Sequence, residues 1–303
     1  MKSADIVELK DVIHSSINAN SDSRSSSMPD LKGNTGSVRV AIVGAGCGDV
    51  ELLTLKAARL ISSADALIYD SLVSADILEL ASNECEMHFA GKRCGMPSAK
   101  QDDINHLLVA CAKRGLKVVR LKGGDPNVFG RGCEEAIYLA KHGIASQFVP
   151  GVTAALGCAA SAGIPLTHRG VARSVTLVTG TVIDDSSRTG VGWQALLTAQ
   201  STLVFYMGKE QAAHIAHGLL TAGASIKLPM VFISSGARVE QKLSFATLGT
   251  MAEVASQLQV SGPTLMIVGE VVSVGQELGE LINQVEYSNH GVISRDKEMS
   301  ESA

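Results

Sequence analysis

Short apolar runs alternate with amphipathic stretches through the first half of the chain. The runs have the length of buried strands, and the stretches between them repeat apolar positions at helical spacing. The pattern predicts strands at 38–43, 66–70, 86–89, 116–121 and 146–149, and helices at 51–62, 101–114 and 133–142. Alternation of this kind is typical of a parallel sheet that is covered by helices.

The same alternation starts again after Pro150. It predicts strands at 174–179, 202–206, 230–234 and 264–268, a further strand at 241–247, and helices at 153–162, 211–221 and 251–258. No Gly/Ser linker separates the two sets, which indicates domains that are tightly joined. We therefore expect the α/β class, with two α/β domains, mainly parallel sheets and an active-site cleft between the domains.

The two ends of the chain differ in composition from the rest. Seven serines lie between residues 15 and 27, where too few apolar side chains occur to order the segment. From Tyr287 the sequence is again polar and charged. We predict a disordered tail over residues 1–36, an N-terminal domain over 37–150, a C-terminal domain over 151–286 and a second disordered tail over 287–303.

Composition limits the kinds of binding partner and the cellular compartment that we expect for this protein. The 303 residues carry a formal net charge of -4, which argues against a nucleic-acid partner, because such partners select basic surfaces. No apolar run approaches the roughly 20 residues of a membrane span, so no membrane partner is expected. The six cysteines form no C-x-x-C pair and no Cys/His zinc spacing. We therefore expect reduced thiols in a cytoplasmic protein without a metal site.

Candidate chemistry concentrates in one stretch, RLKGGDPNVFGRG, which runs from Arg120 to Gly132. It joins the expected strand at 116–121 to the expected helix at 133–142. Paired glycines after a parallel strand let a ligand approach bare backbone, and an acidic residue beside them accepts hydrogen bonds from it. Gly-Asp-Pro alone is also ordinary turn chemistry. The glycines on both sides of Arg131 favour a binding loop over a plain turn.

A second glycine-rich loop, GAGCGD, follows the first expected strand at residues 44–49. Its spacing is G-x-G-x-G and differs from the G-x-G-x-x-G of a dinucleotide-binding turn. Asp70 ends the second strand but does not clearly match the acid that holds a ribose in that motif. No Gly-Lys-Ser/Thr and no G-x-S-x-G occurs in the chain, which excludes a P-loop and a hydrolase elbow.

Six motifs occur in one order: GAGCGDVELLTLKA, Tyr69-Asp70, GKRCG, RLKGGDPNVFGRG, VPGVTAALGCAASAGIPLTHR and Tyr206-Met207-Gly208. Together they resemble the tetrapyrrole methylases, from about residue 38 to residue 274. The resemblance implies a homodimer that uses S-adenosyl-L-methionine and releases S-adenosyl-L-homocysteine. It also implies C-methylation of uroporphyrinogen III at C2 and C7 to give precorrin-2, for sirohaem, cobalamin or haem d1 biosynthesis. The segment before Val38 is too short for a dehydrogenase–ferrochelatase module, so we expect a monofunctional methyltransferase.

The resemblance also implies roles for single residues. It implies cofactor contacts from Cys47, Gly123, Gly124, Asp125, Val128, Thr153, Ala154, Met207 and Gly236. The implied catalytic set is Asp70 as proton acceptor, Lys92 as proton donor, and Arg131 with Glu134 where the tetrapyrrole enters. The substrate carries eight carboxylates, and their candidate partners are Arg93, Arg120, Arg131, Arg169 and Arg173.

Other functions stay open at this point. A relative could act on a later corrin ring, on RNA or on a protein, although the acidic charge and the GKR and GRG segments favour uroporphyrinogen III. A protein of another class would sense S-adenosylmethionine without any chemistry. Turnover of uroporphyrinogen III separates these alternatives. The first loop also departs from the family, which has a proline at the position of Cys47.

Overall fold

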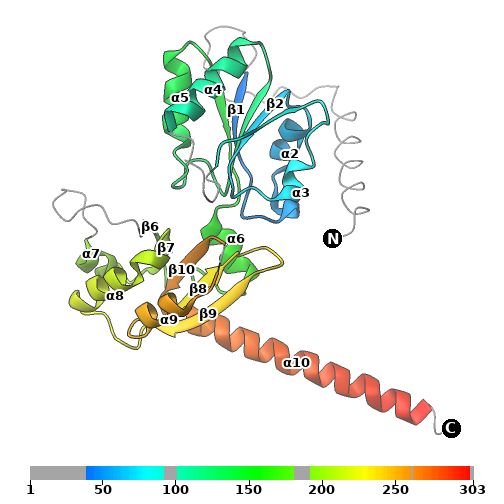
Figure 1. The fold of residues 1–303 in the computed structure, drawn as a ribbon. Coiled ribbons are helices and arrows are strands. Elements are labelled where there is room, and N and C mark those ends of the chain that lie inside the picture. Colours follow the sequence, from blue (N-terminus) through cyan, green and yellow to red (C-terminus); the bar gives the residue numbers. More distant parts are fainter. Residues whose placement is uncertain (1–38, 92–100, 181–191, 261, 301–303) are drawn as a thin grey trace. The chain divides into compact units, whose positions relative to one another are not determined.

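The computed structural model describes residues 39–91, 101–180, 192–260 and 262–300, with side chains described as far as residue 285. The chain divides into two compact units between Thr153 and Ala154, shortly after the boundary expected at Pro150. Figure 1 shows each unit as a sheet with its own helices. The predicted N-terminal tail at 1–36, together with Lys92 and Arg93, lies outside the described residues.

The first unit contains a five-stranded sheet in the order β3-β2-β4-β1-β5. Its strands are β1 (Val40–Gly44), β2 (Ala66–Tyr69), β3 (Glu86–Phe89), β4 (Val118–Lys122) and β5 (Ser146–Val149). All neighbouring strands in this sheet are parallel. The parallel α/β sheet predicted for the first domain is therefore confirmed, and all five strands were expected from their apolar runs.

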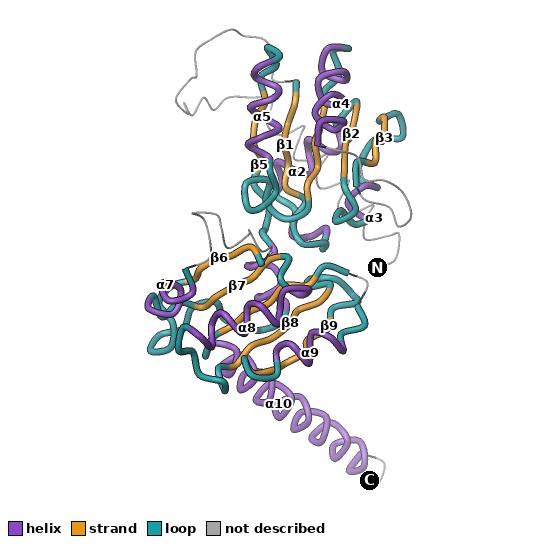
Figure 2. Tube along the Cα trace, turned by 60° about the vertical axis from the view of Figure 1, so that its left-hand side comes forward, coloured by secondary structure: helices purple, strands orange, loops and turns teal. Residues whose placement is uncertain are grey.

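Helices cover both faces of this sheet (Figure 2). The helices are α2 (Leu55–Ser62), α3 (Ala75–Leu78), α4 (Gln101–Lys113) and α5 (Gly132–Lys141). On one face, Ile61 of α2 and Ile77 of α3 pack against Leu67 and Leu121. On the other face, Leu108 of α4 and Leu139 of α5 pack with strand residues such as Ile42 and Ile68. Each fully buried side chain of this kind contributes about 1.5–3 kcal/mol of hydrophobic stabilisation.

The helix expected at 51–62 is interrupted. A short 3-10 turn, η1 (Val50–Leu52), comes first, and its N-cap Asp49 accepts a hydrogen bond from the Glu51 N–H at 2.9 Å. Thr54 then caps α2, because its Oγ1 accepts from the Ala57 N–H at 3.1 Å. The apolar period alone did not reveal this second cap, so the predicted single helix was wrong in its first turn.

The second unit has a mixed sheet in the order β6-β7-β10-β8-β9. Its strands are β6 (Val175–Thr179), β7 (Thr202–Tyr206), β8 (Pro229–Ser234), β9 (Lys242–Thr247) and β10 (Thr264–Val268). Only β6 and β7 pair in parallel. Strand β10 lies antiparallel between β7 and β8, and β9 pairs antiparallel with β8. The expectation of a mainly parallel second sheet is corrected, because β10 enters between two strands that run in the same direction.

The helices of the second unit are α6 (Ala154–Ser161), α7 (Trp193–Thr198), α8 (Ala212–Thr221), α9 (Met251–Gln257) and α10 (Val271–Ser300), with a 3-10 turn η2 (Lys209–Gln211). Leu219 of α8 and Met251 of α9 pack on Phe205 and Phe232 to form the core. The structure continues α10 through Ser300, whereas the sequence pattern predicted disorder from Tyr287. No helix in the described parts of the chain has the length and apolarity that a bilayer crossing needs.

Candidate functional site

The carboxyl ends of the five parallel strands meet at one edge of the first sheet. Strands β1 and β4 are neighbours there, and the helices that follow them, α2 and α5, pack on opposite faces. Ligands of open α/β sheets bind in the crevice at such a switch point. The two glycine-rich loops singled out in the sequence follow these two strands, so the fold brings them together.

Three glycines lie in backbone contact at this edge. A Cβ on Gly44 would stand 2.6 Å from the Gly124 carbonyl oxygen, and a Cβ on Gly151 would stand still closer to the same atom. Gly46 and Gly124 also exchange two backbone hydrogen bonds, of 3.2 and 2.6 Å. Glycine is therefore needed at positions 44 and 151 because backbone segments approach each other too closely there to leave room for a side chain. Gly124, with φ of 68°, keeps a conformation that favours glycine.

Asp125 connects the loop after β4 to the loop after β5. Its Oδ1 accepts from the Asn127 N–H at 2.8 Å, and its Oδ2 accepts from the Gly151 N–H at 3.1 Å. A carboxylate offers about four acceptor positions, so two of them stay available to a ligand. Asp125 is therefore both a turn residue and a candidate ligand residue, and the two interpretations of Gly-Asp-Pro are compatible.

Replacing Asp125 by Ala is expected to weaken binding of S-adenosylhomocysteine by about 1.5–3 kcal/mol, the range for hydrogen bonds to charged groups. Asp125→Asn is the matched control, because an amide oxygen still accepts one of the two backbone N–H groups. Its loss of affinity should be smaller than that of the Ala variant. Titration calorimetry measures both values, and unchanged affinity in Asp125→Ala would remove this carboxylate from the ligand site.

Cys47 is half-buried in the loop between Gly46 and Gly48. If the loop after β1 contacts the cofactor, S-adenosylhomocysteine should slow alkylation of this thiol by maleimide about ten-fold, because thiol reactivity follows access. Exposed Cys133 on α5 is an internal control in the same sample. Peptide mapping that finds Cys47 labelled at the same rate with and without the ligand would place this loop outside the cofactor site.

A buried charge cluster, formed by Arg120, Lys122 and Glu135, lies beside the strand ends. All three side chains are at most 6% exposed. The Glu135 Oε1 accepts from Arg120 Nε at 3.2 Å and from Lys122 Nζ at 2.9 Å. Burial, followed by the nearby charge of Arg120, holds the pKa of Lys122 below its ordinary value. Arg120 was expected to bind substrate carboxylates, but its side chain is committed to this cluster.

Asp70 lies at the end of β2, within reach of the cluster. Its Oδ1 accepts from the Leu72 N–H at 3.0 Å, and its Oδ2 is 3.9 Å from Arg120 Nη2. The side chain is 23% exposed, so the carboxylate faces both the buried cations and solvent. This position suits a group that must exchange a proton with a ligand.

Arg131 and Glu134 form an exposed pair at the start of α5. Arg131 Nη2 donates to Glu134 Oε2 at 2.6 Å, and Nε donates to both carboxylate oxygens at 3.0 and 3.1 Å. These hydrogen bonds hold the pKa of Glu134 below its ordinary value and raise the pKa of Arg131. The backbone of Arg131 has φ of 59°, which is uncommon for a residue with a side chain. Val128 lies in the same loop, and its N–H donates to the Asp125 carbonyl at 3.3 Å.

In the second unit, Ala154, Met207 and Gly236 gather around α6. The Tyr206 hydroxyl accepts from the Ala155 N–H at 2.8 Å, which ties the first turn of α6 to the end of β7. Met207 follows with φ of 53° and a side chain that is 55% exposed. A Cβ on Gly236 would stand 2.7 Å from the Cβ of Cys158, so this glycine lies directly against α6. Thr153, directly before α6, is buried.

The loop that carries Gly236 is held in an unusual backbone conformation. Ser235 and Ala237, on either side of the glycine, have φ of 49° and 57°. The Gln241 Oε1 accepts from the Ala237 N–H at 2.8 Å and from the Ser161 Oγ at 2.6 Å. Residues in sparsely populated backbone regions persist where their surroundings fix them, and they concentrate at ligand sites. No pattern in the sequence predicted these supporting hydrogen bonds.

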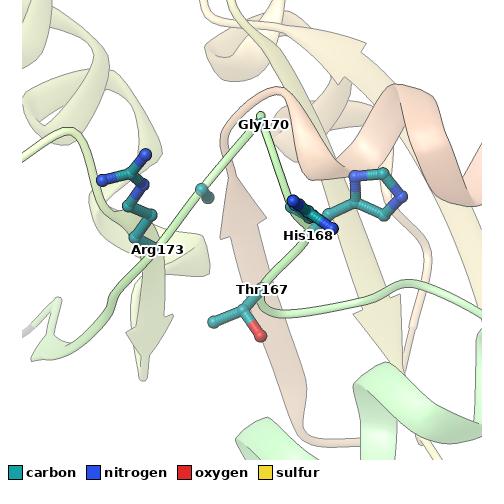
Figure 3. A pocket seen from close by; sticks show the side chains of 6 residues that line it. Thr167, His168, Gly170 and Arg173 are labelled. Atoms are coloured by element: carbon teal, nitrogen blue, oxygen red, sulfur yellow. The ribbon is translucent and has the colours of Figure 1, made fainter.

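A cationic loop between α6 and β6 lines a hollow of about 350 Å³. It contains His168, Arg169 and Arg173, and the backbones of His168 and Ala172 exchange two hydrogen bonds of 3.0 Å that close it. Figure 3 shows Gly170 at the turn, with His168 and Arg173 on either side. Neither guanidinium has an ion-pair partner within the described part of the chain. Both arginines therefore remain candidates for contact with an anionic ligand.

The described residues contain no group of His, Cys, Asp and Glu that could hold a metal ion. The candidate sites consist of bare backbone, one acidic loop and two sets of arginines. Lys92, the predicted proton donor, lies outside the described residues.

Comparisons with known proteins agree on one family. The chain is 47% identical over 239 residues to a siroheme synthase of Pseudomonas aeruginosa and 48% identical over the same length to one of Acinetobacter baylyi. These matches cover 79% of this chain and 51% and 52% of the relatives, so the chain spans about half the length of the curated relatives it matches. A uroporphyrin-III C-methyl transferase of Thermus thermophilus, solved with S-adenyl homocysteine, is 41% identical with a TM-score of 0.66, and the match covers 78% of this chain and 99% of that one. The family description "Tetrapyrrole (Corrin/Porphyrin) Methylases" matches residues 39–252, and the chain belongs to that family.

Proposed function

We propose that this protein transfers methyl groups from S-adenosyl-L-methionine to C2 and C7 of uroporphyrinogen III, which gives precorrin-2. The observation that supports the substrate is that each unit exposes arginines: Arg131, directly before α5, in the first unit, and Arg169 and Arg173 of the cationic loop in the second. A substrate with eight carboxylates needs such partners, because guanidinium groups bind carboxylates through two parallel hydrogen bonds. The Thermus relative is named a uroporphyrin-III C-methyl transferase, which supports a tetrapyrrole of this kind as the substrate.

The residues at the strand ends fit S-adenosylmethionine. Its ammonium and ribose hydroxyls need acceptors, and Asp125 has acceptor positions left beside its two backbone hydrogen bonds. Gly123 and Gly124 offer bare backbone next to this carboxylate. The resemblance also assigns Met207 and Gly236, of the second unit, to the cofactor. When bound, the cofactor supplies a methyl group that is already activated by a sulfonium, so the protein has mainly to align donor and acceptor.

The remaining chemistry is a proton transfer. After a ring carbon of the tetrapyrrole gains a methyl group, a proton must leave a neighbouring bridge carbon. Asp70 is the proposed acceptor, because its carboxylate is partly exposed and stays close to the cationic Arg120. Arg131 would hold a substrate carboxylate, and Glu134 would keep the guanidinium in one orientation through its hydrogen bonds. A homodimer and a cytoplasmic location belong to the same proposal as predictions from the resemblance and the cysteine pattern.

The test is turnover of enzymatically prepared uroporphyrinogen III with S-adenosylmethionine under anaerobic conditions. We expect a product that oxidises to a chromophore of the sirohydrochlorin type and that forms only when both reactants are present. Binding of S-adenosylmethionine without turnover would favour a sensor of the cofactor. Methyl transfer to RNA, with none to the tetrapyrrole, would overturn the proposal.

A further inference from the structure

The buried charge cluster extends toward both groups that carry the proposed chemistry. Its central residue, Glu135, is fully buried in the first turn of α5, directly after exposed Glu134. Besides Arg120 and Lys122, the amide of Gln101 donates to Glu135 Oε1 at 3.2 Å. Three donors from two other elements, α4 and β4, therefore converge on one carboxylate oxygen.

Arg120 connects this carboxylate to Asp70. While its Nε donates to Glu135, its Nη1 donates to the carbonyls of Ile68 at 3.3 Å and Leu121 at 3.1 Å. Its Nη2 then lies 3.9 Å from Asp70 Oδ2. In this orientation the planar guanidinium contacts β2, β4 and α5 at the same time. The position of Asp70 depends on that orientation.

Glu135 also fixes the position of Arg131. The N–H groups of Glu134 and Glu135 both donate to the Arg131 carbonyl, at 3.1 and 3.3 Å. Because the Glu135 side chain is bound to two residues of β4, the first turn of α5 cannot shift along the sheet without breaking those contacts. The Glu135 side chain therefore keeps the two catalytic candidates, Asp70 and Arg131, at a fixed position relative to each other.

Stability alone does not account for this arrangement. Two cations share one buried carboxylate, and within the described residues Glu135 Oε2 has no hydrogen-bond partner. Well-packed apolar side chains of similar volume usually stabilise a protein as much as a buried ion pair does, or more. Such a cluster beside a ligand crevice indicates a role in the site that apolar side chains cannot fill.

We infer that Glu135 is a positioning residue for methyl transfer, which orients Asp70 through Arg120 and Arg131 through the first turn of α5. This inference rests on the proposed function. Activity of the wild-type chain tests the proposed function separately, because the kcat of a Glu135 variant can be compared only with that of an active wild type.

The primary test is Glu135→Gln in the full chain, with uroporphyrinogen III as substrate. We expect kcat to fall at least about ten-fold, while the Kd of S-adenosylhomocysteine stays within about two-fold, since neither Asp70 nor Arg131 is assigned to the cofactor. The split between kcat and cofactor affinity is the readout, because a general loss of structure would lower both.

A second variant separates charge from position. Glu135→Gln combined with Lys122→Met restores the net charge of the cluster and removes one unpaired buried cation, so it should fold even if the single variant does not. We expect kcat to stay low although the net charge is restored, because a neutral amide holds the Arg120 guanidinium less firmly than a carboxylate does. A merely structural role predicts recovery of kcat together with stability.

Glu86→Gln is the matched control. Glu86 also binds an arginine, Arg114, but the pair is exposed and lies at the start of β3, at the opposite edge of the sheet. It should leave kcat and the Kd of S-adenosylhomocysteine unchanged. Wild-type kcat in folded Glu135→Gln would overturn the inference, as would full recovery of kcat in the double variant.

Discussion

Replacing Arg131 by Lys should lower kcat/KM for uroporphyrinogen III by about 10–150-fold, the equivalent of one hydrogen bond to a charged group. Lysine keeps the positive charge but has no planar fork, so it cannot donate in parallel to a substrate carboxylate. The loss is expected to be large because Glu134 already orients the guanidinium through three contacts. An ammonium would pair with Glu134 as a point charge and lose that orientation.

Affinity for S-adenosylhomocysteine is the discriminating readout for this variant. It should stay within about two-fold of the wild-type value, because Arg131 is assigned to the tetrapyrrole and not to the cofactor. Arg114→Lys is the matched control, since Arg114 also pairs with a glutamate in an exposed position but lies away from the strand ends. If cofactor affinity falls in step with turnover, the assignment of Arg131 to the tetrapyrrole is wrong.

Gly151→Ala should lower the free energy of unfolding of the first unit by about 3 kcal/mol or more, at the upper end of the range for overpacking. The new Cβ would meet backbone atoms of Gly124 and Gly44, and backbone cannot move aside as a flexible side chain can. The shift would also disturb the hydrogen bond from the Gly151 N–H to Asp125. Cofactor affinity should therefore fall together with stability.

Native-state hydrogen exchange of amides in β1 and β4 measures this effect within the first unit. The single tryptophan, Trp193, belongs to the second unit, so its fluorescence should report an unchanged unfolding transition there. Gly279→Ala is a control for which we expect the free energy of unfolding to rise instead of fall. No atom lies within 4 Å of a Cβ at this exposed position of α10, and alanine should stabilise the helix by about 0.5–1 kcal/mol. Normal exchange in Gly151→Ala would contradict the close packing of the three glycines.

Local patterns were sufficient for most of the fold. The strands, and the helices α2, α4, α5, α6, α8 and α9, were expected within a few residues of their positions because apolar period and length are local properties of the sequence. The helices α3, α7 and α10 were not predicted. The order of the second sheet was not accessible in this way. Strand β10 pairs with β7 and β8, which are distant in sequence, and its apolar run is the same for a parallel and an antiparallel neighbour. The direction of β10 follows from tertiary contacts.

The same contrast between local patterns and tertiary contacts holds for the candidate site. The motifs drew attention to the loops after β1 and β4, which the fold brings together, and the resemblance named Arg131 with Glu134. The sequence interpretation made Arg120 a substrate partner, because nothing local links it to Glu135, on the next helix. It also placed Gly44 in a glycine-rich loop that was compared with a dinucleotide-binding turn. Bare backbone serves a ligand or a neighbouring strand equally well, and only the fold distinguishes the two uses.

The most direct test of the central claim is the position of the transferred methyl groups. The full chain would be incubated with uroporphyrinogen III and S-adenosylmethionine that carries carbon-13 in its methyl group, and the product would be studied by NMR. We expect labelled methyl groups on C2 and C7, and none on any other ring carbon. Label at other carbons, or a labelled macromolecule with an unchanged tetrapyrrole, would contradict it.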